Sequence, residues 1–234
     1  MDRLIYTAVS GLSSSMVRQR MIASNMANAQ TIGFRAELMC QTPMTLDGPS
    51  LEVRAMGHGE VHGALMRPGT FTPTGRDLDV ACTGDALLAV QAPDGTEAYT
   101  RRGDLSVAAT GVLQNGEGLP IIGQGGPITV PPGSQVSIAP DGGVMLFDPA
   151  VPEAAPVQVD RIKLANWRGT DIQKDLTGLF RVTGGGALPT DEDARLAVAT
   201  LEQSNVNPGE VLVEMVEAQR LFDIRTKLIG TAKE

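Results

Sequence analysis

The sequence predicts an α+β fold in which one α-helix at each end of the chain flanks a central antiparallel β-rich domain. Three observations predict it. Both ends carry apolar residues at helical spacing, the middle alternates with a period of two, and glycine-containing turns punctuate that middle. The chain has 234 residues, 27 of them glycine and 15 proline, but aromatic residues make up only 3%. Its core is therefore expected to consist of valine, leucine, isoleucine, alanine and methionine.

The first helix is predicted from Asp2 to about Ala29, a stretch without proline and with Gly11 as its one glycine. Mostly apolar residues follow each other at steps of three or four, with one polar step, which is close to the 3.5-residue period of a coiled coil. This predicted assembly seam consists of Ile5, Val9, Leu12, Met16, Gln19, Ala23 and Met26. Two amides lie beside it. Asn25 is expected to fix packing register between subunits, whereas Asn28 serves either as a register residue or as the end of the helix.

The last helix is predicted to begin at Pro208, with Asn207 as its N-cap, and to run to about Ile229 before Gly230. Its stripe consists of Val211, Met215, Ala218, Phe222 and Ile229. The N-terminal arm carries mostly arginines and the C-terminal arm mostly carboxylates, a bias that favours pairing of one arm with the other. The two helices are thus predicted to pair in a coiled-coil-like manner as one discontinuous domain, 1–36 plus 200–234.

The middle of the chain predicts short strands joined by tight turns. Residues 87–91 and 97–101 flank Asp94-Gly95, a strong hairpin signal, and 136–139 and 144–147 flank Asp141-Gly142. Further strands are expected at 105–107, 112–114, 119–122, 128–130, 161–165 and 179–182. A central β domain at 77–182 follows, with an extended or mixed connector at 37–76 and a return connector at 183–199.

Composition disfavours several function classes. The formal charge of −8 disfavours nucleic acid as a partner, and no apolar run is long enough to insert into a membrane. Cys40 and Cys82 cannot complete a thiolate metal site, and His58 and His62 lie in a glycine-rich loop, so neither a metal nor a cofactor is expected. No secretory signal is recognisable, and neither a nucleophile elbow nor a phosphate loop occurs.

The residues alone leave the function open. The two apolar seams indicate self-assembly, but amphipathic helices that pack on their own β domain are equally consistent with the periodicity. A β-sandwich adaptor or binding module is a second class. A hydrolase that uses the acidic run 191–193 is a third, although an acidic solvated turn explains this run better.

Three ordered motifs resemble a known family. The segment from Ala23 to Ala29, followed by Thr31, Gly33, Phe34 and Arg35, is similar to the N-terminal signature of bacterial flagellar rod and hook proteins. The run from Leu201 to Pro208, followed by Glu214, Met215, Val216, Gln219 and Arg220, resembles their C-terminal signature. The central match consists of Leu78-Asp79-Val80-Ala81, Gly84-Asp85 and the run from Tyr99 to Asp104.

The resemblance implies a structural subunit of the flagellar basal-body rod, not an enzyme, that polymerises through its terminal helices into the axial drive shaft. Its implied partners are other rod subunits and copies of itself. The implied route is the flagellar type III export apparatus, without a cleaved signal peptide. The opening from Met1 to Tyr6 and the short length are most similar to proximal-rod members, and the alternative is another axial protein such as a distal-rod subunit.

Overall fold

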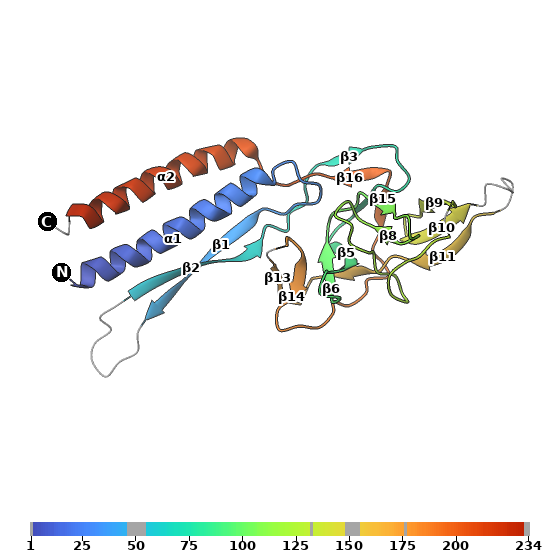
Figure 1. Ribbon diagram of the computed structural model, residues 1–234, viewed down its shortest axis with the longest axis horizontal. Helices are drawn as coiled ribbons and strands as arrows, with labels where there is room; N and C mark the ends of the chain where they lie inside the picture. The colour runs from blue at the N-terminus through green and yellow to red at the C-terminus, as the bar shows by residue number, and fades with distance from the viewer. Residues whose placement is uncertain (1, 46–54, 132, 148–154, 176, 232–234) are drawn as a thin grey trace. The chain divides into compact units, whose positions relative to one another are not determined.

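The computed structural model describes residues 2–45, 55–131, 133–147, 155–175 and 177–231 (Figure 1). The chain divides into two compact units. The first, here the helical unit, comprises Met1–Ala29, Ala36–Leu65 and Val206–Glu234, and the second, here the β unit, comprises Gln30–Arg35 and Met66–Asn205. The α+β class is therefore confirmed.

The helical unit contains the two predicted helices and a long hairpin. Helix α1 (Asp2–Ala27) and helix α2 (Pro208–Thr231) lie side by side, and strands β1 (Glu37–Thr45) and β2 (Ala55–Ala64) run along α1 (Figure 1). The two strands pair antiparallel with a bulge between Leu38 and Met39. The sequence predicts only an extended or mixed connector here, because the bulge and three glycines in β2 obscure the alternation.

Small side chains allow the two helices to approach closely. The buried positions of α1 include Ser14 and Ser15, one turn after Gly11. The guanidinium of Arg225 in α2 donates hydrogen bonds to the Gly11 carbonyl and to the Ser15 hydroxyl. The predicted cap of α2 is confirmed, because the Asn207 side chain accepts a hydrogen bond from the Gly209 amide at 3.0 Å.

The β unit contains fourteen short strands among its described residues, all paired antiparallel. They are β3 (Phe71–Pro73), β4 (Val80–Cys82), β5 (Ala86–Gln91), β6 (Glu97–Thr100), β7 (Ser106–Val107), β8 (Leu113–Gln114), β9 (Gln135–Ile138), β10 (Gly143–Phe147), β11 (Val157–Arg161), β12 (Leu164–Asn166), β13 (Ile172–Lys174), β14 (Phe180–Val182), β15 (Leu196–Val198) and β16 (Thr200–Glu202). The larger sheets have the orders β12-β5-β6-β14-β13 and β11-β10-β9, and the pairs β15-β4, β16-β3 and β7-β8 complete the unit.

Both predicted hairpins form. Strands β5 and β6 pair through the turn at Asp94-Gly95, and β9 and β10 pair around Asp141-Gly142. The expected strands at 119–122 and 128–130 were wrong as regular strands, because these segments make isolated bridges to different neighbours. Ile121 and Ile128 are nevertheless fully buried in the core, so their apolar alternation reports burial rather than ladder pairing.

The core of the β unit is one continuous aliphatic cluster, as the composition predicts. Leu88 and Val90 of β5 pack there with Leu105, Leu113 and Val144, all fully buried. Among the described residues, no helix is long and apolar enough to cross a membrane.

Candidate assembly surface and the junction of the sequence motifs

Three of the six described positions of the predicted α1 seam are exposed. Val9 and Met16 are 52% and 58% exposed, and Ala23 is also exposed. Three further seam positions are half-buried: Leu12, Gln19 and Met26. The side chain of Ile5 lies outside the described residues. The buried positions of α1 instead include Ser14, Ser15, Met21, Ile22 and Asn25. No described position of the α1 seam is therefore fully buried within the chain.

The predicted stripe of α2 has the opposite disposition. Val211 and Ala218 are buried, Phe222 is half-buried and Met215 is 36% exposed, while the side chain of Ile229 lies outside the described residues. Ala218 and Arg225 are seven residues apart and share a helix face, and Arg225 contacts α1. Val211 and Ala218 of this stripe therefore face the chain itself, whereas Met215 does not.

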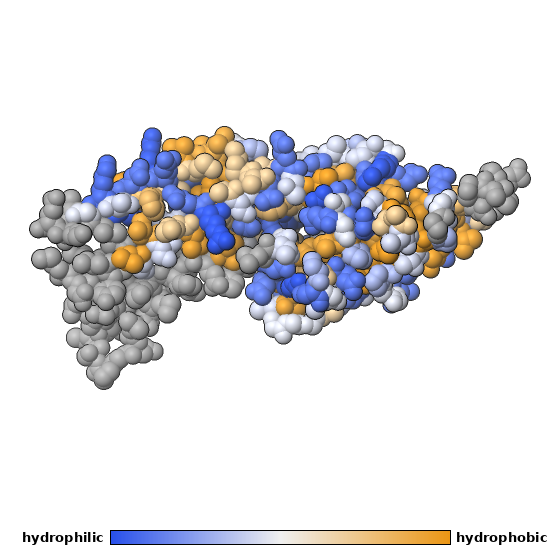
Figure 2. All heavy atoms as spheres, in the orientation of Figure 1, coloured by the Kyte–Doolittle hydropathy of each residue, from blue (hydrophilic) through white to orange (hydrophobic). Residues whose placement is uncertain are grey.

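A second apolar set on α2 is exposed. It consists of Leu212, Val213 and Val216, which are 48%, 60% and 50% exposed, and is called the α2 patch. Figure 2 shows the hydrophobic surface over the N-terminal half of this helix. The helix continues with exposed charged residues, among them Arg220 and Asp223. Contiguous exposed apolar side chains on a helix mark an interaction site more often than a solvated face.

The two predicted amides of α1 act within the helical unit. Asn25 is 5% exposed, donates to the Glu37 carbonyl at 3.1 Å and accepts from the Glu37 amide at 2.8 Å. It therefore ties the start of β1 to the helix. Asn28 donates to the Ser24 carbonyl at 2.9 Å, and its own amide donates to the same oxygen at 3.1 Å, as expected of a residue at a helix end.

The three sequence motifs converge inside the β unit. Glu202 pairs with Arg35 through Oε1 at 2.7 Å and with Arg101 through Oε2 at 3.2 Å. The three side chains are at most 1% exposed and are called the clasp. Burial, the largest effect, lowers the pKa of Arg35, and the neighbouring Glu202 carboxylate opposes this shift.

Backbone contacts reinforce the clasp. The Gly33 amide donates to the Glu202 carbonyl at 2.8 Å, and the Gly69 amide donates to Glu202 Oε1 at 2.9 Å. Asn205 donates through its side chain to the Arg67 carbonyl at 2.8 Å and through its amide to the Phe34 carbonyl at 3.3 Å. The N-terminal and C-terminal motifs therefore lie against each other, a contact that the sequence analysis missed. The one feature of the sequence that pointed to this contact was the opposite charge of the two arms, to which Arg35 and Glu202 contribute.

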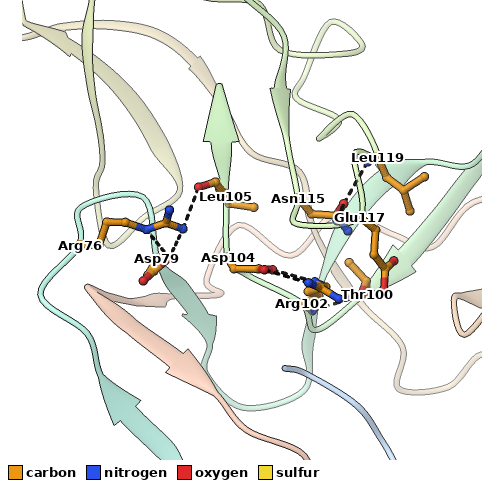
Figure 3. Close-up of polar contacts among 9 residues, drawn as sticks. All are labelled: Arg76, Asp79, Thr100, Arg102, Asp104, Leu105, Asn115, Glu117 and Leu119. Atoms are coloured by element: carbon orange, nitrogen blue, oxygen red, sulfur yellow. Dashed lines mark hydrogen bonds and ion pairs between the residues drawn. The ribbon is translucent and has the colours of Figure 1, made fainter. Parts of the chain in front are cut away.

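The Arg102-Gly103-Asp104 tripeptide forms an internal ion pair (Figure 3). Arg102 donates to both carboxylate oxygens of Asp104, at 2.8 and 3.0 Å, and also pairs with Glu117 at 3.1 Å. These contacts raise the pKa of the Arg102 guanidinium, with the hydrogen bond to Asp104 as the largest cause. Both charged groups of the tripeptide are thus engaged within the chain, in a segment without a regular turn where Asp104 makes a β-bridge to Asp79.

The acidic run 191–193 forms a bend that the Asp191 side chain caps. Asp191 accepts hydrogen bonds from the amides of Asp193 and Ala194 at 3.1 Å and from the Asn166 side chain at 2.8 Å. A carboxylate held in this way shapes its own loop, and the structure does not bring a paired acid to it at hydrogen-bonding distance among the described residues.

Comparisons with known proteins agree with the position of the motifs. Residues 5–35 match a family model described as flagella basal body rod protein. Residues 81–146 match the flagellar hook protein FlgE/F/G D1 domain, and residues 198–234 match the flagellar basal body rod FlgEFG protein C-terminal model. Arg35 and Glu202 lie in the first and last of these, and Arg101 lies in the central one.

Relatives that align over nearly their whole length are also flagellar rod proteins. The chain is 41% identical over 240 residues to the flagellar basal-body rod protein FlgF of Salmonella typhimurium, and 38% identical over 240 residues to FlgF of Escherichia coli. Both alignments cover 100% of this chain and 95% of the relative. The rod protein FlgG of Bacillus subtilis is 30% identical over 257 residues, covering 100% of this chain and 96% of the relative. The chain therefore belongs to the flagellar basal-body rod protein family, is similar to its FlgF members, and is a structural subunit rather than an enzyme.

Proposed function

We propose that this rod subunit polymerises through its terminal helices, with copies of itself and with other rod subunits as neighbours. The observation that carries the proposal is the exposure of apolar side chains on both helices. Val9 and Met16 on α1 and the α2 patch are between 48% and 60% exposed. Burial of such side chains by neighbouring subunits contributes about 25 cal/mol per Å² of apolar surface removed from water, before the entropic cost of association is subtracted.

The helical unit is the proposed assembly domain. We infer that its exposed apolar side chains pack against helices of neighbouring subunits in a coiled-coil-like manner. The near-3.5-residue period of the α1 seam supports this packing. The proposed assembly domain contains both helices of the predicted domain 1–36 plus 200–234. It also includes the β1–β2 hairpin, which contacts α1.

Deletion of residues 209–234 tests the proposal. In a strain whose only copy is the truncated chain, we expect loss of motility, because α2 and its patch are removed. The β unit should remain folded, since it ends before residue 209. Trp167, the single tryptophan of the chain, lies in the β unit, so its fluorescence reports the fold of that unit. Normal motility in this strain would contradict the proposal.

A second part of the proposal concerns localisation. We propose export to the basal body through the flagellar type III apparatus, without removal of an N-terminal peptide and without contact with nucleic acid or insertion into a membrane. The expected result is an intact mass, measured on protein from purified basal bodies, that includes the N-terminal residues of α1. A mass lacking the first 15 to 30 residues, roughly the length of a secretory signal, would refute export without cleavage.

A further inference from the structure

The clasp is a buried cluster with unbalanced charge. Arg35 and Arg101 contribute two positive charges and Glu202 one negative charge, and all three side chains are at most 1% exposed. In the part of the chain that the structure describes, Glu202 is the one carboxylate paired with either guanidinium. A guanidinium keeps its proton at any physiological pH, so loss of Glu202 would leave two buried cations rather than two neutral groups.

The arginines have other partners, but these are neutral. Arg35 donates to the Arg67 carbonyl at 2.7 Å, and Arg101 donates to the Cys82 carbonyl at 2.7 Å and to the Gly84 carbonyl. Carbonyl dipoles satisfy individual N–H groups, but they do not cancel the net charge. The free energy of the buried cations therefore depends on the Glu202 carboxylate.

Glu202 arrives with the last strands of the β unit. It ends β16, which pairs with β3, and β15 directly before it pairs with β4 through Leu196 and Cys82. The same C-terminal segment thus supplies two closing strands and the counter-ion for both arginines. Residues 1–195 alone contain the two buried cations without their carboxylate.

We propose that Glu202 is a folding latch of the β unit: the unit becomes stable only when this carboxylate has entered between Arg35 and Arg101. The latch couples folding of a unit that begins at residue 30 to the arrival of a residue near its C-terminal end. Since the chain is synthesised from its N-terminus, the β unit would stay unfolded until residue 202 has emerged.

The chain carries its own probe of the latch. Cys82 is buried beside the clasp, and burial raises the pKa of its thiol to about 11, whereas Cys40 is exposed. In a Cys40→Ser background, the rate at which a thiol reagent modifies Cys82 reports opening of the β unit. Trp167 fluorescence during urea unfolding gives a second readout of the same unit.

The decisive variant in this full-length background is Glu202→Gln, which keeps the shape of the side chain and removes its charge. We expect Cys82 to react roughly 150- to 5,000-fold faster than in the parent, the fold-change that corresponds to removing one partner of a buried ion pair. The matched control is Glu210→Gln, an exposed carboxylate in the first turn of α2, and it should leave the rate unchanged. Parent-like protection of Cys82 in Glu202→Gln would overturn the proposal.

A charge-neutral variant keeps the test valid if Glu202→Gln does not fold. Replacing the whole clasp as Arg35→Met, Arg101→Met and Glu202→Leu removes both cations together with their counter-ion. We expect this triple variant to protect Cys82 at least about 10-fold better than Glu202→Gln, because uncompensated charge is the proposed cause of opening. If the triple variant is as reactive as Glu202→Gln or more so, the latch is refuted. These rates are measured on the purified protein, so they are independent of motility and of the export route.

Discussion

Replacing Gly33 by alanine is expected to destabilise the β unit by roughly 4 kcal/mol or more, the range of the most damaging single substitutions. Gly33 has a φ of +69°, and a Cβ at this position would lie 2.4 Å from the Arg101 carbonyl carbon and 2.5 Å from the Arg102 nitrogen. Both atoms belong to the backbone, which cannot rotate away as a side chain does. The N-terminal motif would have to separate from the segment that carries Arg101, and the clasp would open.

The control for Gly33→Ala is Gly118→Ala. Gly118 has a similar φ of +80°, but a Cβ at this position would meet no atom within 4 Å beyond its chain neighbours. Gly118→Ala should lower the free energy of unfolding by only about 1–2 kcal/mol, the cost of a left-handed conformation for a residue with a Cβ. Urea unfolding followed by Trp167 fluorescence measures both. Equal destabilisation by the two substitutions would show that the close approach at Gly33 contributes nothing.

Placing charges in the α2 patch is expected to abolish motility without unfolding the chain. The double variant Leu212→Glu/Val216→Glu replaces two side chains that are about half exposed, so it removes little packing within the helical unit. In an assembled rod the same carboxylates would be buried against a neighbour, and each unpaired buried charge costs several kcal/mol. Swimming in soft agar measures motility, and circular dichroism of the purified protein measures the fold.

The matched control adds the same charge elsewhere on α2. Gln219→Glu/Thr226→Glu introduces two carboxylates at exposed polar positions of α2 that follow the patch toward the C-terminus of the helix. This variant should swim better than the patch variant, because its charges do not lie in the apolar part of the helix. Equal loss of motility in both variants would indicate a general effect of negative charge on α2 rather than burial of the patch.

Much of the fold could be predicted because its signals are local. The cap at Asn207 and the turn at Asp94-Gly95 depend on a few neighbouring residues, and both form as predicted. The irregular segments at 119–122 and 128–130 could not be assigned, because their pairing depends on partners such as Leu113 that are distant in sequence or shared. Their apolar residues indicate burial but not the ladder to which they belong.

The candidate assembly surface could likewise be predicted only in part. Periodicity locates an apolar seam on each helix, but it does not say which seam packs within the chain and which remains exposed for other subunits. On α1 no described position of the predicted seam is buried, whereas on α2 Val211 and Ala218 are buried and a neighbouring set is exposed. The clasp joins residues 35, 101 and 202. These residues are far apart in the sequence, and no sequence pattern predicts contact over such distances. Only the opposite charges of the two arms pointed to it.

The most direct test of assembly through the helices is site-specific photo-crosslinking in assembled basal bodies. A photoreactive residue at Val216, in the α2 patch, is compared with one at Thr110, in an exposed turn of the β unit. Crosslinks from position 216 to a second copy or to another rod subunit, formed only in assembled basal bodies, are the predicted result. A chain that is incorporated into basal bodies but forms no crosslink to a subunit from position 216 would contradict the account.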